Sequence, residues 1–258
     1  MFVNTLSNSK KETFDQCKLK YKYNYIDKLK GDPGDESAMN FGSYIHKILE
    51  EGYNSDSLDH LLKLAEQHKP TYKIPYRYSE KTEKCLKNFL KFNKNLGETV
   101  GCELKYEVEI APGMTVNGVI DRIIKGKDGG LLVIDYKTSK REKTKIDLFD
   151  DSQLQGYTFA CHKEFGVPIE DITCAHYYPV TNNLVPIKYG RKKILRWVKN
   201  TVDKIWEMRK IKMNELTSSR NSFCDWCNYK AGCDQFESDP GARQRIVESW
   251  EPKPPYGG

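Results

Sequence analysis

The chain has 258 residues, of which 38% are apolar and 30% charged, and its formal net charge is +6. This size and apolar content predict one core-bearing domain of moderate size. No apolar run approaches the roughly 20 residues of a membrane helix, and the N-terminus lacks a signal-like segment, so we expect an intracellular, cytoplasmic protein without a membrane partner. The mild basic excess fits a polyanionic partner but is weak evidence by itself.

Helical patterns fill the first part of the chain. A capping-box pattern from Ser9 to Glu12 predicts a helix start, and apolar residues at helical spacing continue to Ile26. Three more helices are expected at residues 41–52, 58–68 and 79–96, and together they make a helical block at 41–100.

From Glu103 the periodicity becomes that of β-strands. Strands are expected at 103–110, 114–125 and 131–137, then a helix at 152–165, strands at 172–178 and 184–188, and a basic helix from 191 to about 213. This order predicts an α/β (mixed α+β) class with a central mixed sheet flanked by helices. We expect a single domain over residues 1–238, with its core at 103–213, and a weakly ordered tail at 239–258.

Two carboxylates face each other across one expected hairpin. A loop centred on Asp128 pairs residues whose numbers sum to 256, so Asp121 lies opposite Asp135 with Cβ atoms about 5 Å apart. Carboxylates this close repel unless a cation lies between them, and hard oxygen ligands select Mg²⁺ or Mn²⁺ rather than zinc. Lys137 points to the same face as Asp135. A bare D-x-K pattern occurs by chance in many chains, so the prediction of a site depends on the facing Asp121.

Several motifs resemble the RecB-type motifs of PD-(D/E)XK nucleases. They are the segments Gly118–Arg122, Val133–Ser139 and Gln153–Tyr157, in matching order and spacing. Upstream, Phe41–His46 resembles the helix whose histidine joins the metal in that family, as in RecB, AddB and the CRISPR-associated RecB-like exonucleases. The resemblance extends from Cys17 to Cys233 and implies a restriction-endonuclease-like core.

The resemblance also implies a role for each motif residue. The implied metal ligands are His46, Asp121, Asp135 and the backbone carbonyl of Tyr136. The metal would polarise the scissile phosphate and lower the pKa of a bound water. Lys137 would orient that water or offset developing charge. Gln153 and Tyr157 would steady the lysine and the strand being cut, although an ordinary amphipathic helix explains their spacing equally well. Glu107 is a weaker candidate for an outer-shell acid.

Three cysteines form a C-x₂-C-x₅-C pattern that needs a fourth ligand from elsewhere. They are Cys224, Cys227 and Cys233, and spacing cannot choose the fourth ligand among the other cysteines and His176. A zinc site satisfies the same count and is slightly favoured by chemistry alone. However, an early helical cysteine followed by aromatic residues, here Cys17, is similar to part of the [4Fe–4S] clasp of AddB and the CRISPR-associated nucleases. The resemblance thus implies a structural cluster that joins the N- and C-terminal parts.

The activity implied by the resemblance is a Mg²⁺- or Mn²⁺-dependent deoxyribonuclease. We expect an exonuclease on single-stranded DNA or free ends, with a helicase, recombination or CRISPR-adaptation protein as a possible partner. Lys140 and Arg141, close after the metal strand, are expected to bind DNA phosphates. The alternatives are a catalytically silent DNA-binding or assembly module and a zinc-stabilised scaffold. A module would have no physical reason to contain His46, Asp121, Asp135 and Lys137 together.

Overall fold

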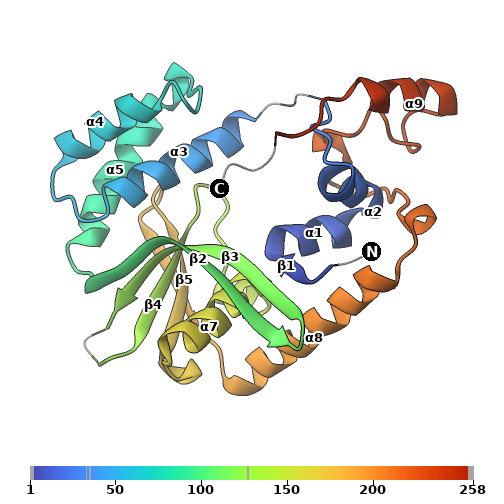
Figure 1. The fold of residues 1–258 in the computed structure, drawn as a ribbon. Helices are drawn as coiled ribbons and strands as arrows, with labels where there is room; N and C mark the ends of the chain where they lie inside the picture. Colours follow the sequence, from blue (N-terminus) through green and yellow to red (C-terminus); the bar gives the residue numbers. More distant parts are fainter. Residues whose placement is uncertain (1–2, 33, 35, 127, 255–258) are drawn as a thin grey trace. The chain divides into compact units, whose positions relative to one another are not determined.

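The chain folds as two compact units. The computed structural model describes residues 3–32, 34, 36–126 and 128–254 (Figure 1). One unit is made from both ends of the chain, Met1–Glu36 and Val202–Gly258, and the other is Ser37–Thr201. The single nuclease domain expected over residues 1–238 stays a prediction. Within the described residues, no helix combines the length and apolar character that crossing a membrane requires.

The larger unit is built on a mixed sheet. Its strands, in spatial order, are β2 (Glu98–Ala111), β3 (Met114–Lys125), β4 (Leu131–Tyr136), β5 (Ile172–Tyr178) and β6 (Asn183–Lys188). Strands β4 and β5 are parallel because a helical crossover joins them, whereas the other neighbours are antiparallel. The mixed sheet flanked by helices confirms the predicted fold class.

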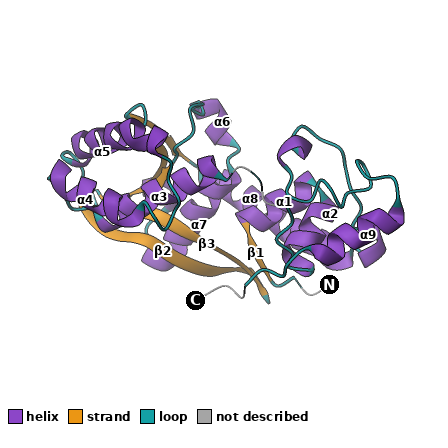
Figure 2. Ribbon diagram, turned by 90° about the horizontal axis from the view of Figure 1, so that it is seen from above, coloured by secondary structure: helices purple, strands orange, loops and turns teal. Residues whose placement is uncertain are grey.

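Helices cover both faces of this sheet (Figure 2). One group consists of α3 (Ser37–Glu51), α4 (Leu58–His68) and α5 (Ser79–Asn93), which pack on one another. The crossover contains the short α6 (Lys145–Phe149) and α7 (Ser152–Phe165). After β6, α8 (Arg191–Lys210) begins in this unit and ends in the smaller one.

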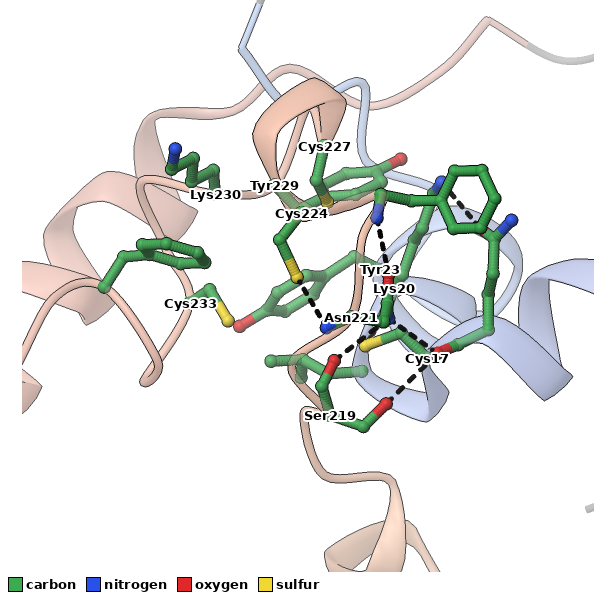
Figure 3. Close-up of a pocket in the computed structure, with 14 residues that line it drawn as sticks. Cys17, Lys20, Tyr23, Ser219, Asn221, Cys224, Cys227, Tyr229, Lys230 and Cys233 are labelled. Atoms are coloured by element: carbon green, nitrogen blue, oxygen red, sulfur yellow. Dashed lines mark hydrogen bonds between the residues drawn. The ribbon is translucent and has the colours of Figure 1, made fainter.

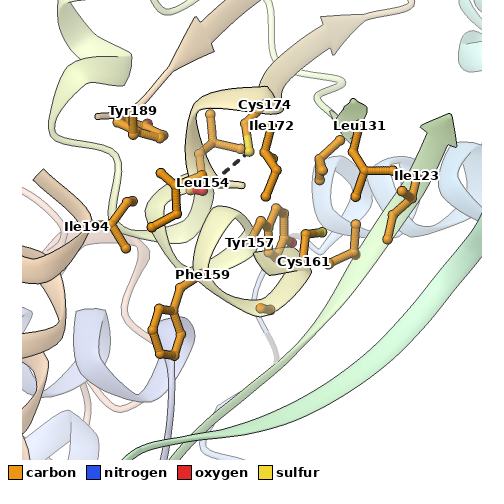
Figure 4. Packing of buried hydrophobic residues seen from close by; sticks show 14 of the residues in the cluster. Ile123, Leu131, Leu154, Tyr157, Phe159, Cys161, Ile172, Cys174, Tyr189 and Ile194 are labelled. Carbon is orange, nitrogen blue, oxygen red and sulfur yellow. Dashed lines mark hydrogen bonds between the residues drawn. The ribbon is translucent and has the colours of Figure 1, made fainter. Parts of the chain in front are cut away.

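Strand alternation divides the core between the two faces. Ile123 and Val133 belong to the cluster around α7, whereas Ile124 and Ile134 belong to the cluster under α3, α4 and α5. Figure 4 shows the first cluster, in which Leu154 and other α7 side chains lie against the sheet. Because β4 is covered on both sides, the charged residues at its end mark the point where the chain leaves the core.

The smaller unit contains β1 (Thr5–Ser7), α1 (Asn8–Gln16), α2 (Lys18–Tyr21), a π-helical turn at Lys22–Ile26 and α9 (Pro240–Ser249). Its first helix departs from our prediction. The N-cap is Ser7, whose hydroxyl accepts the Lys10 N–H at 3.3 Å, so the capping box at Ser9 was wrong. The helix also breaks at Cys17, which is extended (φ −162°) and caps α2.

The C-terminal segment is more ordered than we expected. Residues 240–249 form α9, which is capped by Asp239, where a weakly ordered tail was predicted. Beyond it Trp250 is 7% exposed and packs edge-on against Tyr23 and Tyr229, with ring centroids 5.4 Å away in both pairs. The Trp250 indole N–H also donates to Asp32 at 2.9 Å. Aromatic burial therefore orders a segment whose Pro and Gly content suggested disorder; residues 255–258 lie outside the described chain.

Candidate active site

The β3–β4 hairpin has the predicted register. The pairs Arg122↔Ile134 and Ile123↔Val133 follow the rule that partner numbers sum to 256. One step further, the same register sets Asp121 opposite Asp135. The Asp121 carboxylate accepts the backbone N–H of Tyr136 at 2.6 Å, which fixes the end of β4 to β3.

Three side chains from three elements form a candidate metal site. His46 comes from α3, Glu103 from β2 and Asp121 from β3, and one ligand atom of each lies within 4.8 Å of the others. His46 Nδ1 is 3.5 Å from Asp121 Oδ2 and 4.0 Å from Glu103 Oε1. Its other ring nitrogen, Nε2, lies 2.9 Å from the Tyr136 carbonyl oxygen. Among the described residues, no other group of three or more histidine, cysteine or acidic side chains is so close.

Glu103 was not among our candidates. It lies between the β2–β3 pairs Cys102↔Arg122 and Leu104↔Ile120, which places it opposite Asp121. Its backbone is left-handed (φ 46°), a conformation that costs a non-glycine residue roughly 1–2 kcal/mol. Glu107, our weaker candidate for an outer-shell acid, accepts the Thr115 hydroxyl at 3.0 Å across the hairpin and is not part of this group. The acid that the structure brings to His46 and Asp121 is Glu103.

A second set of contacts surrounds Lys137. Its Nζ lies 2.6 Å from Asp135 Oδ2 and donates to Gln153 Oε1 at 3.3 Å. Gln153 Nε2 donates to the Tyr157 hydroxyl at 2.7 Å, and that hydroxyl donates to the Val119 carbonyl at 2.7 Å. Tyr157 is also 3.4 Å from Asp135 Oδ1. Helix α7 thus holds both the lysine and the carboxylate at the end of β4.

The charges at this site perturb one another. Burial alone would lower the pKa of His46, but Asp121 and the other nearby carboxylates raise it to about 9. Burial raises the pKa of Asp135 to about 6, against the favourable charge of Lys137. Burial and the charge of Asp121 also raise the pKa of Glu103. Acids crowded in this way favour a bound cation.

The site opens into a cleft of about 570 Å³. Its walls come from α3, β2, the end of β4 and neighbouring segments, and it is lined by Met39, Gly42, Ser43, His46, Lys47, Glu50, Tyr72, Glu103, Tyr136, Lys137, Thr138 and Ser139. A Cβ on Gly42 would lie 3.3 Å from the Thr138 hydroxyl, so the glycine lets the helix approach this wall. Lys140 and Arg141 follow directly on the exposed loop.

The four cysteines that the resemblance selected line one pocket of the smaller unit (Figure 3). They are Cys17, Cys224, Cys227 and Cys233. The Sγ of Cys17 accepts the Lys20 N–H at 3.5 Å, and that of Cys224 accepts the Asn221 N–H at 3.3 Å. His176, the histidine left open as an alternative ligand, is instead fully buried beside Asp135.

The sulfur atoms in this pocket are not spaced for a single ion. Within the described chain no three of them lie within 4.8 Å of one another. Tetrahedral zinc, with Zn–S bonds of about 2.3 Å, holds its thiolates roughly 3.8 Å apart. Of the remaining cysteines, Cys85, Cys161 and Cys174 are buried, as expected for core residues, and Cys102 is partly buried.

Comparison with known proteins identifies the family. Residues 5–234 match the family model of the PD-(D/E)XK nuclease superfamily. The chain belongs to this superfamily. A solved structure of a candidate exonuclease from Eubacterium rectale is similar in fold, with 15% identity, a TM-score of 0.55 and coverage of 88% of each chain. The protein SSO0001 matches with 17% identity and a TM-score of 0.42, covering 92% of this chain and 89% of its own. No curated protein matches the sequence.

The residues expected to carry the superfamily's motif lie at the ends of β3 and β4. That assignment, of Asp121, Asp135 and Lys137, stays a prediction. In the structure Asp121 belongs to the candidate metal group, whereas Asp135 contacts Lys137 and Tyr157 of α7. The two carboxylates therefore have different neighbours although they are opposite in register.

Proposed function

We propose that this chain is a divalent-metal-dependent deoxyribonuclease of the RecB-like type. The observation that carries the proposal is the group His46, Glu103 and Asp121 beside the ion pair of Asp135 with Lys137. A surface cluster of acids would have no need of a half-buried lysine that is hydrogen-bonded to a side chain of α7. A catalytically silent DNA-binding module would need neither the group of metal ligands nor this lysine.

The residues present fit a hard divalent cation. His46 Nδ1 and the carboxylates of Glu103, Asp121 and Asp135 offer nitrogen and oxygen ligands of the kind that Mg²⁺ or Mn²⁺ accepts. If His46 Nε2 carries the proton, it donates to the Tyr136 carbonyl and leaves Nδ1 free for the metal, a usual arrangement for a metal-binding histidine. In this arrangement the Tyr136 carbonyl, which we expected to be a ligand, would act by orienting His46.

Lys137, Gln153 and Tyr157 would stabilise the transition state of phosphodiester hydrolysis, directly or through their neighbours. A bound metal would polarise the scissile phosphate and lower the pKa of a water. The charge of Asp135 raises the pKa of Lys137 despite burial, so the lysine remains a cation able to offset charge on the phosphorane. Gln153 and Tyr157 would hold this lysine and Asp135 in place.

We further propose exonuclease action on single-stranded DNA or free ends. The fold likeness to a candidate exonuclease supports this, and the exposed Lys140 and Arg141 could bind phosphates beside the cleft. A helicase, recombination or CRISPR-adaptation partner belongs to the same proposal and rests on the resemblance of the motifs. We also propose a cytoplasmic setting.

In the smaller unit we propose a structural [4Fe–4S] cluster held by Cys17, Cys224, Cys227 and Cys233. All four thiols are free and line one pocket. A four-iron cluster takes one thiolate per iron, so its ligands stand farther apart than those of one zinc ion. Protein purified anaerobically should be brown and contain iron and sulfide. A colourless preparation with stoichiometric zinc would refute the cluster.

The nuclease proposal is tested with end-labelled single- and double-stranded DNA, incubated with Mg²⁺, Mn²⁺ or EDTA. We expect metal-dependent cleavage that EDTA abolishes without unfolding the chain, and the product ladder will report polarity and strand preference. Protein that binds DNA at fixed salt but never cuts with either metal would favour the silent module.

A further inference from the structure

His176 is a buried histidine next to the candidate active site. It lies on β5, in parallel register with Asp135 on β4, and is completely inaccessible to solvent. Its Nε2 is 3.4 Å from Asp135 Oδ2 and 3.8 Å from Asp151 Oδ2. Among the described residues neither His176 Nε2 nor Asp135 Oδ2 makes a hydrogen bond of good geometry, although Asp135 Oδ2 has its ion pair with Lys137. The two buried polar atoms lie next to each other, and leaving His176 Nε2 unsatisfied would be costly.

The surroundings of His176 favour one position for its ring proton. The backbone N–H of Lys143 donates to the Tyr178 hydroxyl oxygen at 2.8 Å. The hydroxyl hydrogen of Tyr178 is then free to point to His176 Nδ1, which is 3.4 Å away. When that hydroxyl donates to Nδ1, the proton of a neutral imidazole lies on Nε2, next to the two carboxylates.

Asp151 links this histidine to helix α7. It is the N-cap of α7, and its Oδ1 accepts the backbone N–H groups of Gln153 at 3.0 Å and Leu154 at 3.1 Å. Its Oδ2, the atom nearest His176, also accepts from Lys143 Nζ at 2.6 Å. The start of the helix that carries Gln153 and Tyr157 is therefore in contact with the same imidazole as Asp135.

We propose that His176 is a positioning residue of the nuclease site, whose Nε2–H holds Asp135 and joins the end of β4 to the N-terminus of α7 through Asp151. This inference rests on the proposed nuclease function, because the positioned groups are the carboxylate and the helix assigned to catalysis. With Oδ2 held by His176 and Lys137, the Oδ1 atom of Asp135 is kept on the side of Tyr157. An apolar side chain at position 176 would remove one of these two partners.

The test compares His176→Leu with His176→Gln in the full chain. Mn²⁺ alone is titrated into EDTA-treated, dialysed protein by calorimetry, and single-turnover cleavage is measured beside it. Loss of such an outer contact typically weakens metal affinity or activity about 10- to 100-fold, and we expect a loss of this size in His176→Leu. His176→Gln should recover most of it, because its amide N–H₂ can occupy the place of Nε2. His162→Leu is the matched control, since the His162 ring lies at the far end of α7 and hydrogen-bonds to the Val167 carbonyl just beyond it.

The outcomes separate this inference from the proposed function. Mn²⁺ binding by the wild type without any cleavage refutes the nuclease but leaves His176 testable through affinity. Unchanged Mn²⁺ affinity and cleavage in a folded His176→Leu refute the inference alone, as does a His176→Gln variant that loses as much as His176→Leu. If His176→Leu does not fold, ¹⁵N chemical shifts of His176 in metal-free wild type decide: a proton on Nδ1 would refute the inference, and one on Nε2 supports it.

Discussion

A substitution of Lys137 distinguishes a nuclease from a protein that only binds DNA. It contacts Asp135 and Gln153, and as a cation it is not a ligand for the proposed metal. Lys137→Ala should therefore reduce cleavage by about 10²- to 10³-fold, equivalent to roughly 2.7–4 kcal/mol, while DNA affinity changes little. Single-turnover cleavage and a binding assay at the same salt concentration measure the two quantities. Undiminished cleavage in this variant would refute the assigned site.

Glu103 should contribute to metal binding and Glu107 should not. Glu103→Gln keeps the size of the side chain but removes the charge beside Asp121, so Mn²⁺ affinity should fall. Glu107→Gln, on the same strand, retains an acceptor for the Thr115 hydroxyl and should bind Mn²⁺ like the wild type. Calorimetric titration of both variants decides between these acids. Equal affinities in the two variants would exclude Glu103 from the site.

Metal affinity should depend on pH through His46. Its pKa is raised to about 9 by the surrounding carboxylates, and that of Asp135 is raised by burial to about 6. Between these values the imidazole is protonated, and a metal must displace that proton. Affinity for Mn²⁺ should consequently rise with pH, by up to about tenfold per unit, and level off above the pKa of His46. In His46→Gln this slope should disappear; a slope that persists would mean that another group is displaced.

The sequence could predict Asp121 and Asp135 as partners, and the same count would have found Glu103. The β3–β4 hairpin is regular, so counting from its loop gives the correct register. The strands expected at 103–110 and 114–125 leave a loop centred on Pro112, so residues whose numbers sum to 224 face each other, which puts Glu103 opposite Asp121. The structure keeps this sum between Gly101 and Glu109 of β2, with an irregularity between Glu109 and Ala111. The left-handed backbone of Glu103 could not be predicted, because no local sequence pattern marks it.

At the scale of elements, the N-cap of α7 is the feature that places two site residues. Asp151→Ala removes the acceptor of two backbone N–H groups and should cost about 1 kcal/mol of stability. It should also lower the rate of cleavage, because α7 carries Gln153 and Tyr157. Asp239→Ala removes the corresponding cap of α9, which carries none of the proposed catalytic residues, and should leave cleavage unchanged. Thermal unfolding and single-turnover rates of both variants test this; equal cleavage would contradict it.

The periodicity of apolar residues predicted most helices and strands. It did not predict the breaks that polar residues cause in them. The ranges expected for β3, α4, α7 and β5 agree with the structure because each buries a regular apolar face. The break at Cys17 was missed because apolar residues continue at helical spacing on both sides of it. The extended backbone at Cys17 places a side chain that lines the cysteine pocket. The pattern of apolar residues does not predict such a break.

At the scale of the whole molecule, the cysteine pocket should govern the stability of the smaller unit. Cys227→Ser removes one proposed cluster ligand and should reduce iron and sulfide content and the temperature of unfolding. Cys102→Ser changes a cysteine of the larger unit, outside the pocket, and should keep the full iron content. Metal analysis and thermal unfolding of anaerobic samples measure both effects. A Cys227→Ser protein that keeps its full iron content would show that the cluster has other ligands.

The smaller unit is made from both ends of the chain, and this fixes an order of events during synthesis. The ribosome releases residues 37–201 as a continuous stretch, so the unit with the candidate metal site has all its residues before its neighbour does. Cys17 is translated before that stretch, yet the other cysteines that line its pocket are translated only at positions 224–233. A nascent chain stalled between these points would hold all residues of the larger unit and only one of the four cysteines. Under the proposed cluster, iron would therefore be delivered to the pocket only after the larger unit has all its residues.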